Sequence, residues 1–270
     1  MCAIIDLHTH HERCGHATGT LRDYIEVAIR KGFRAIGLSD HAPLFAHRHE
    51  HPAPEIQMGK HEFENYLSEA VELKQIYSDR IEVLVGAECD YLPGTEAIYQ
   101  QALQDERLDY VLGSVHEFSG YHVFKPSTWQ HVQDPEEVYS LYYSAVRCAA
   151  ESGLFDVVAH IDAIRAMGPA TDCDILPYIE DAVDAIARNG IAVEINTSGI
   201  RKCGESFPAA SLVKMLHSMC VPFTYGSDSH HPEEVGYGWE EVSRVLLGLG
   251  VHRLLKFDKR RPVEVEIPSA

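Results

Sequence analysis

The stretch Asp6-Leu7-His8-Thr9-His10 begins on the last residue of a predicted buried strand, Ala3–Asp6, so that His8 and His10 follow that strand. Alternate residues of an extended segment point to the same side, so His8 and His10 can offer both imidazoles to one metal ion. A lone histidine after a strand is usually an ordinary loop residue, but two at this spacing favour a metal site. Further apolar runs that end in residues of ligand type recur along the chain.

Short apolar runs alternate with longer segments of helical periodicity, as βα units do. The expected strands are Ala3–Asp6, Ala35–Ser39, Ile81–Ala87, Tyr110–Val115, Val157–Ile161, Ile191–Ile195 and Pro222–Gly226. The expected helices are Leu21–Lys31, Glu62–Tyr77, Thr95–Gln104, Glu136–Glu151, Leu176–Arg188, Ala209–Met219 and Glu240–Leu247. About seven units come close to the eight of a (β/α)8 barrel, with an open doubly wound sheet as the alternative. No linker is visible, so residues 1–270 are expected to form one domain.

Two connections are longer than a barrel needs, Ala42–His61 and Glu117–Pro135. Long ordered loops on the active face of a barrel often act as lids or as walls around the substrate.

Candidate metal ligands fall at the ends of most of the predicted strands or in the loops that follow them. Since all strand C-termini of a parallel barrel open on one face, these side chains are expected to converge there. Taken singly, Glu88 could be a helix cap and Asp228 a turn residue, but their joint appearance favours a site for two or three ions bridged by Glu88. The nine candidates are His8, His10, His16, His41, Glu88, His116, His160, Asp228 and His230.

Arg165 and Arg201 follow the fifth and sixth predicted strands. Guanidinium groups match phosphate oxygens with paired donors, so the two arginines suggest an anion clamp, which Lys202 could assist. Ordinary surface ion pairing is the alternative for each. The other histidines are expected to be solvated or, for His11 and His231, to lie beside the ligands.

The formal charge of −18 argues against a protein that grips nucleic acid by its phosphates. Seven cysteines, an odd number without a C-x-x-C pair, fit a reducing cytoplasm better than a disulfide framework. Neither a signal peptide nor a membrane-spanning run is visible, and the sequence does not reveal an oligomeric state.

The chain resembles the PHP (polymerase and histidinol phosphatase) superfamily and, within it, the monofunctional histidinol-phosphatases. The resemblance spans nearly the whole chain, through Asp6–His10, Asp40–Leu44, Glu88–Gly94, Asp109–His116, Asn196–Lys202 and Gly226–His230. It implies an α/β fold, a distorted (β/α)7 TIM-like barrel, with three divalent ions (Zn, Fe or Mn). The implied ligand sets are His8, His10, Glu88 and Asp228; Glu88, His116 and His160; and His16, His41 and His230.

The resemblance also implies hydrolysis of a small phosphate monoester, most specifically L-histidinol phosphate. Arg165 and Arg201 match residues of the family that hold the substrate phosphate, and catalytic roles are expected for Glu88, Asp228 and His231. Glu117 and the loop Ser119–Gln133 depart from the family pattern, and Glu117 or Glu50 could face the ammonium of the substrate. The alternatives are another phosphoester (a nucleotide, a sugar phosphate or an oligonucleotide end), an amidohydrolase, and a metal-binding module without catalysis.

Overall fold

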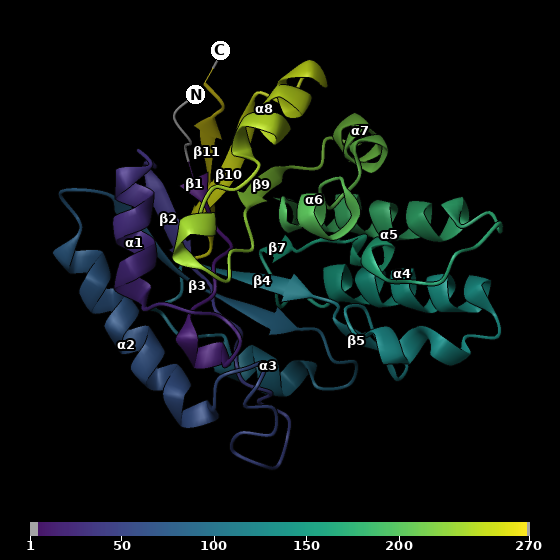
Figure 1. The fold of residues 1–270 in the computed structure, drawn as a ribbon, viewed down its shortest axis with the longest axis horizontal. Coiled ribbons are helices and arrows are strands. Elements are labelled where there is room, and N and C mark those ends of the chain that lie inside the picture. Colours follow the sequence, from purple (N-terminus) through teal and green to yellow (C-terminus); the bar gives the residue numbers. More distant parts are fainter. Residues whose placement is uncertain (1–4, 269–270) are drawn as a thin grey trace.

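Seven parallel strands form the centre of the molecule in a computed structural model that describes residues 5–268 (Figure 1). Their order in the sheet is β1-β2-β3-β4-β7-β8-β9, which follows the order of these seven strands along the chain. Their bounds are β1 Ile5–Asp6, β2 Ala35–Leu38, β3 Glu82–Asp90, β4 Tyr110–Ser114, β7 Val157–Val158, β8 Ala192–Asn196 and β9 Phe223–Gly226.

The first and last strands of this sheet meet and nearly close it into a barrel. The amide of Leu7 donates to the carbonyl of Tyr225 at 2.9 Å, and Thr9 forms a parallel bridge with Ser229. The Asp6 carboxylate accepts the amide of Ser227 at 2.9 Å. The predicted (β/α)7 TIM-like barrel is therefore confirmed, and the open doubly wound sheet is excluded.

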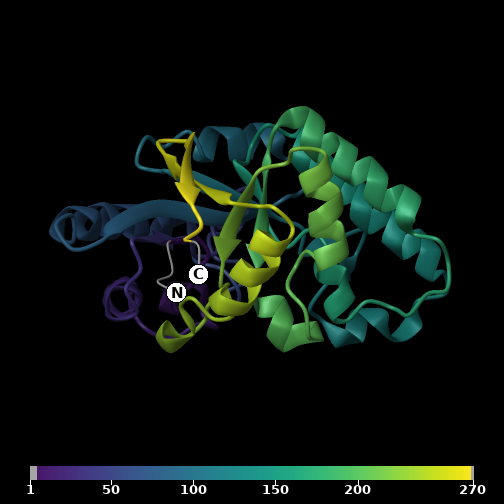
Figure 2. The same cartoon turned by 90° about the horizontal axis from the view of Figure 1, so that it is seen from above.

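Helices surround the strands (Figures 1 and 2), with α4 and α5 packed side by side. They are α1 Leu21–Arg30, α2 Lys60–Ile76, α3 Glu96–Ala102, α4 Pro135–Glu151, α5 Leu176–Asn189, α6 Ser198–Cys203, α7 Ala210–Ser218 and α8 Trp239–Gly248. Short 3-10 turns are η1 Glu12–Cys14, η2 Pro126–His131, η3 Ala163–Ala166 and η4 Pro232–Glu234. Within residues 5–268, none of the helices has both the length and the apolar composition needed to cross a membrane.

Each of the seven expected helices is present within a few residues of its predicted bounds, whereas two strands differ in length. β3 extends to Asp90 because the backbone of residues 88–90 pairs with β4. β7 ends at Val158, before His160, whose φ of 29° turns the chain out of the strand. Residues 3 and 4 of the first predicted strand lie outside the described residues.

Two antiparallel hairpins were not expected from the sequence. β5 Glu117–Phe118 and β6 Tyr121–His122 form one within the long connection after β4. β10 Arg253–Asp258 and β11 Arg261–Glu266 form the other near the C-terminus, where β10 packs beside β9 (Figure 2).

Tyr110 links four strands through the barrel interior, and two strand glycines make room for it. Its buried side chain starts on β4, and its hydroxyl donates to the carbonyl of Leu7, just beyond β1. A Cβ atom on Gly86 of β3 would lie 2.3 Å from the tyrosine ring, and one on Gly37 of β2 would lie 2.1 Å from its hydroxyl. Glycine is thus required here by close packing.

We expect Gly86→Ala to lower the free energy of unfolding by about 2 kcal/mol, because the added methyl group overpacks a filled interior. Chemical denaturation measured on the metal-loaded protein would test this. Gly248→Ala is the matched control, since a Cβ there meets no atom within 4 Å and alanine favours the helix. Equal stability of the two variants would contradict the packing argument.

Candidate metal centre

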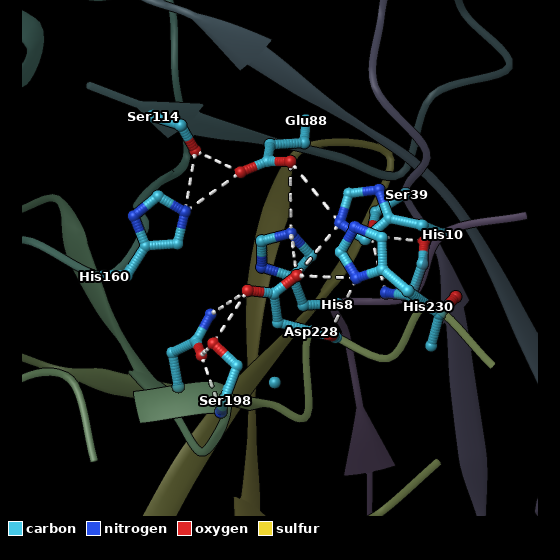
Figure 3. A network of polar contacts seen from close by, with 12 residues as sticks. His8, His10, Ser39, Glu88, Ser114, His160, Ser198, Asp228 and His230 are labelled. Carbon is cyan, nitrogen blue, oxygen red and sulfur yellow. Dashed lines mark hydrogen bonds and ion pairs between the residues drawn. The ribbon is translucent and has the colours of Figure 1, made fainter. Parts of the chain in front are cut away.

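Glu88, near the end of β3, lies at the centre of a cluster of histidines (Figure 3). Its side chain is buried, and five imidazole nitrogens surround its two oxygens. These are His41 Nδ1 at 2.9 Å, His160 Nε2 at 3.1 Å, His8 Nε2 at 3.3 Å, His10 Nε2 at 3.5 Å and His116 Nε2 at 3.6 Å. One carboxylate therefore faces donors from four strand ends, as a ligand that bridges two ions would.

Asp228 completes the cluster from the loop after β9. Its Oδ1 lies 3.1 Å from His10 Nε2, and its Oδ2 accepts a hydrogen bond from Ser198 Oγ at 2.9 Å. The backbone of Asp228 is left-handed, with φ of 52°, as is that of His160. Such conformations cost energy in residues other than glycine and concentrate at functional sites.

Three histidines, His16, His41 and His230, lie close to His10 and are more exposed to solvent than it is. The ring centroids of His41 and His230 each lie 4.2 Å from that of His10, and His16 Nε2 lies 2.9 Å from His230 Nε2. His16 is exposed, and His41 and His230 are partly exposed. The structure thus brings all nine predicted ligands into one continuous site.

The donor set fits divalent metal ions. Several buried side-chain atoms lack a hydrogen-bond partner, among them His8 Nε2, His10 Nε2 and Glu88 Oε2. Buried polar atoms are normally paired, so these atoms point to a bound cation. Four sets of donors lie within 4.8 Å of one another, and three of them consist of predicted ligands alone: His8, His10 and Glu88; His41, Glu88 and His116; and His10, His41 and His230.

The protonation states of Glu88 and His230 also favour a bound cation at this cluster. Burial raises the pKa of Glu88, but His41, His8 and His116 outweigh it and hold the pKa well below its usual range. Burial, together with neighbouring His10, holds the pKa of His230 well below its usual range. The carboxylate is therefore ionised and the His230 imidazole neutral near pH 7, which are the forms that bind metal.

Three carboxylates orient ligand rings from behind, and sequence reasoning assigned them no role. Glu194 on β8 accepts from His8 Nδ1 at 2.6 Å, Asp40 lies 3.2 Å from His10 Nδ1, and Asp90 lies 2.7 Å from His116 Nδ1. A proton held on Nδ1 turns the Nε2 lone pair toward the site. The signal that could have revealed Glu194 is a carboxylate between two apolar residues, Val193 and Ile195, of a buried strand.

Gly226 keeps space for the contact between Glu194 and His8. A Cβ atom there would lie 2.1 Å from Glu194 Oε1 and 2.5 Å from His8 Cβ.

Glu194→Gln should weaken metal binding by roughly ten- to a hundredfold, because the amide can present its NH₂ group to His8 and no longer fixes the ring. Titration of metal into the apoprotein measures the effect. Glu180→Gln, an exposed carboxylate on α5, is the control. Unchanged affinity in Glu194→Gln would show that His8 needs no such support.

A cavity of about 610 Å³ opens in front of the cluster. Arg201 and Lys202 of α6 line it together with candidate ligands including His41, Glu88 and Asp228. Lys202 Nζ lies 3.4 Å from Asp228 Oδ2, and the Arg201 guanidinium lies over the Tyr237 ring. This volume suits a small molecule, and the two cations suit an anion beside the metal ligands.

Arg165 and His231 were expected at the site, but the structure places both elsewhere. The Arg165 guanidinium donates to Asp162 at 2.7 Å and to Glu205 at 2.9 Å, and it does not line the cavity. His231 is exposed and caps η4, where its side chain accepts the amide of Glu233. Both side chains are engaged outside the cluster, Arg165 by Asp162 and Glu205 and His231 by the backbone of η4.

Comparisons with known proteins agree with this geometry. The family model described as "PHP domain" matches residues 6–198. A probable histidinol-phosphatase of Deinococcus radiodurans is 34% identical over 93% of this chain and 95% of its own length. The histidinol-phosphatase of Bacillus subtilis is 29% identical over 87% of this chain and 96% of its own length.

The fold matches solved structures as well. The structure of histidinol phosphate phosphatase from Lactococcus lactis, complexed with Zn, L-histidinol and phosphate, has a TM-score of 0.82 at 20% identity. The match covers 97% of this chain and 100% of that one. A family model matches most of the chain, a relative above 30% identity matches it over nearly its full length, and the barrel is the expected one. This chain therefore belongs to the PHP domain family and, within it, to the histidinol-phosphatases.

Proposed function

We propose that this protein hydrolyses L-histidinol phosphate to L-histidinol and phosphate, using divalent metal ions. The observation that carries the proposal is the cavity that joins the metal-type donors to two cationic side chains, Arg201 and Lys202. The names of the relatives at 34% and 29% identity support the choice of substrate. The formal charge of −18 favours a small metabolite over nucleic acid.

Three ions are proposed, in the sets His8, His10, Glu88 and Asp228; Glu88, His116 and His160; and His16, His41 and His230. Imidazole and carboxylate donors suit Zn, Fe and Mn. Divalent ions held there supply charge that offsets the phosphate oxygens and makes water a stronger acid.

The whole chain is proposed to act as one catalytic domain. The family model ends at residue 198, yet Asp228 and His230 lie among the ligands that come from β1 to β7. A fragment that ends at residue 198 would therefore lack some of the metal ligands.

The protein's own residues have separate tasks in this proposal. Arg201 and Lys202 bind the phosphate oxygens and hold the phosphorus atom in front of Glu88. Asp228, fixed through Oδ2 by Ser198, can accept a proton at Oδ1 from the attacking water and return it to the leaving alkoxide of L-histidinol. His231 is exposed and caps η4, so no acid role is included for it in this proposal.

Phosphate release from L-histidinol phosphate, compared with a nucleotide and a sugar phosphate, tests the proposed function. We expect the highest kcat/KM for L-histidinol phosphate, with activity that depends on added metal. A clear preference for another ester would assign the same metal centre to a different substrate. A protein with full metal content and no turnover of any ester would refute phosphatase activity.

Arg201→Ala and Arg165→Ala should have different effects. Loss of Arg201 is expected to raise KM roughly tenfold, because a charge-assisted contact to phosphate is lost. Loss of Arg165 should instead lower the free energy of unfolding by about 2 kcal/mol, since buried Asp162 loses its ion-pair partner and keeps only the backbone amide of Ala209. Steady-state kinetics and thermal melting of both variants check this, and a raised KM in Arg165→Ala would restore the predicted clamp of two arginines.

A further inference from the structure

The cavity has two chemically different regions. Arg201 and Lys202 place two cations near the metal ligands, whereas other sections of the wall are apolar. The apolar lining comes mainly from Leu44, Ile56, Leu92 and Phe124. A bound phosphate ester would place its phosphate at the cations and its organic group against this wall.

The β5–β6 hairpin adds two polar side chains to that wall. Glu117 and His122 are register partners across the hairpin, and both line the cavity. The hairpin begins directly after the candidate ligand His116, so it lies within reach of a small substrate held at the metal centre. Phe124, just beyond the hairpin, contacts Lys202, with Nζ 4.8 Å from its ring centroid.

Glu117 differs from every other acidic residue that lines the cavity. Asp90 contacts His116 and Gln57, Asp228 contacts Lys202 and Ser198, and Glu234 pairs with Arg201. Glu88 is surrounded by imidazoles. Within residues 5–268, the Glu117 carboxylate has neither a hydrogen bond nor an ion pair, although it faces a cavity with two cations.

Its closest polar neighbour on the hairpin does not neutralise it. His122 Nδ1 accepts the backbone amide of Phe124 at 3.2 Å, and His122 forms no ion pair with the Glu117 carboxylate among the described residues. Glu50, the other acidic group that the sequence suggested, is occupied by His61, whose amide and ring lie 2.6 and 2.7 Å from its Oε1. Among the described acidic residues that line the cavity, Glu117 is thus the one whose carboxylate has no partner within the protein.

We propose that Glu117 is a specificity residue that binds an ammonium group on the substrate. The proposal rests on the proposed function, because the phosphate of the ester must be held at the metal centre. It limits the preferred substrates to phosphate monoesters of small amino alcohols. An anionic phosphate and a cationic amine on one molecule match the cations and the free carboxylate of one cavity.

The test compares L-histidinol phosphate with its analogue that lacks the amino group. For the metal-loaded protein, Glu117→Gln should raise KM for the amine substrate roughly five- to tenfold and leave kcat nearly unchanged. For the analogue, both constants should stay the same. Glu117→Asp should keep some of the preference for the amine.

Glu55→Gln is the matched control, because Glu55 is an exposed carboxylate of the neighbouring 42–61 loop that does not line the cavity. If Glu117→Gln affects both substrates equally, or if Glu55→Gln has the same effect, the carboxylate does not recognise the amine and the proposal fails. If the wild type cleaves neither imidazole compound, the proposed substrate is wrong. Phosphoethanolamine and ethyl phosphate, compared in the same way, then decide the role of Glu117 separately.

Discussion

Glu88→Gln should lower kcat/KM by about a hundred- to thousandfold and release metal from the protein. The Glu88 carboxylate contacts five imidazoles, and both of its oxygens are used. Glutamine keeps the shape but removes the charge and replaces one oxygen with an NH₂ group that cannot bind a cation. The loss therefore affects two of the three proposed ions at once.

Metal content by mass spectrometry and phosphate release over a range of substrate concentrations would measure this effect. Glu72→Gln, an exposed carboxylate on α2, should retain both. Full metal content in Glu88→Gln would show that the histidines suffice to bind the ions. Full activity would show that Glu88 does not bridge ions that matter for catalysis.

Removal of metal by a chelator should abolish activity and lower the melting temperature by about 10 °C. Ligand present at roughly a thousand times its Kd stabilises a fold by about 4 kcal/mol, and each kcal/mol shifts the melting temperature of a chain this size by about 2–4 °C. Without ions, buried atoms such as His8 Nε2 and Glu88 Oε2 have no hydrogen-bond partner.

Return of Zn, Mn or Fe(II), one at a time, would show which ion restores the melting temperature and which restores turnover. The number of ions bound at full activity tests the proposal of three. The Glu88→Gln variant is the control, since a chelator should shift its melting temperature much less. An unchanged wild-type melting temperature would mean that the folded site does not depend on metal.

The cluster of candidate ligands was predictable because most of its residues lie at or soon after a strand end, and parallel strands bring their ends to one face. His8, Glu88 and Asp228 could be selected as candidates without knowing which strands are neighbours. The carboxylates that orient the imidazole rings could be found only with that knowledge. Glu194 meets His8 only because β8 and β1 approach β9 from opposite sides, and sequence spacing does not reveal such a contact.

Arg165 and the β5–β6 hairpin show two other limits. Position along the chain put Arg165 near the active face, but the direction of a long side chain depends on local partners, here Asp162 and Glu205. The hairpin strands have two residues each, too few for an alternating pattern. Its role in the cavity wall depends on the packing of the loop that follows β4.

The closure of the barrel has a consequence for the order of events during folding. Asp6 and Ser227, which are 221 positions apart, join the first strand to the last, and this contact brings His8 beside Asp228. A chain emerging from the ribosome cannot make it until nearly all of the sequence is available. The full ligand set thus forms at a late, slow step of high contact order, and complete metal loading should report a finished fold.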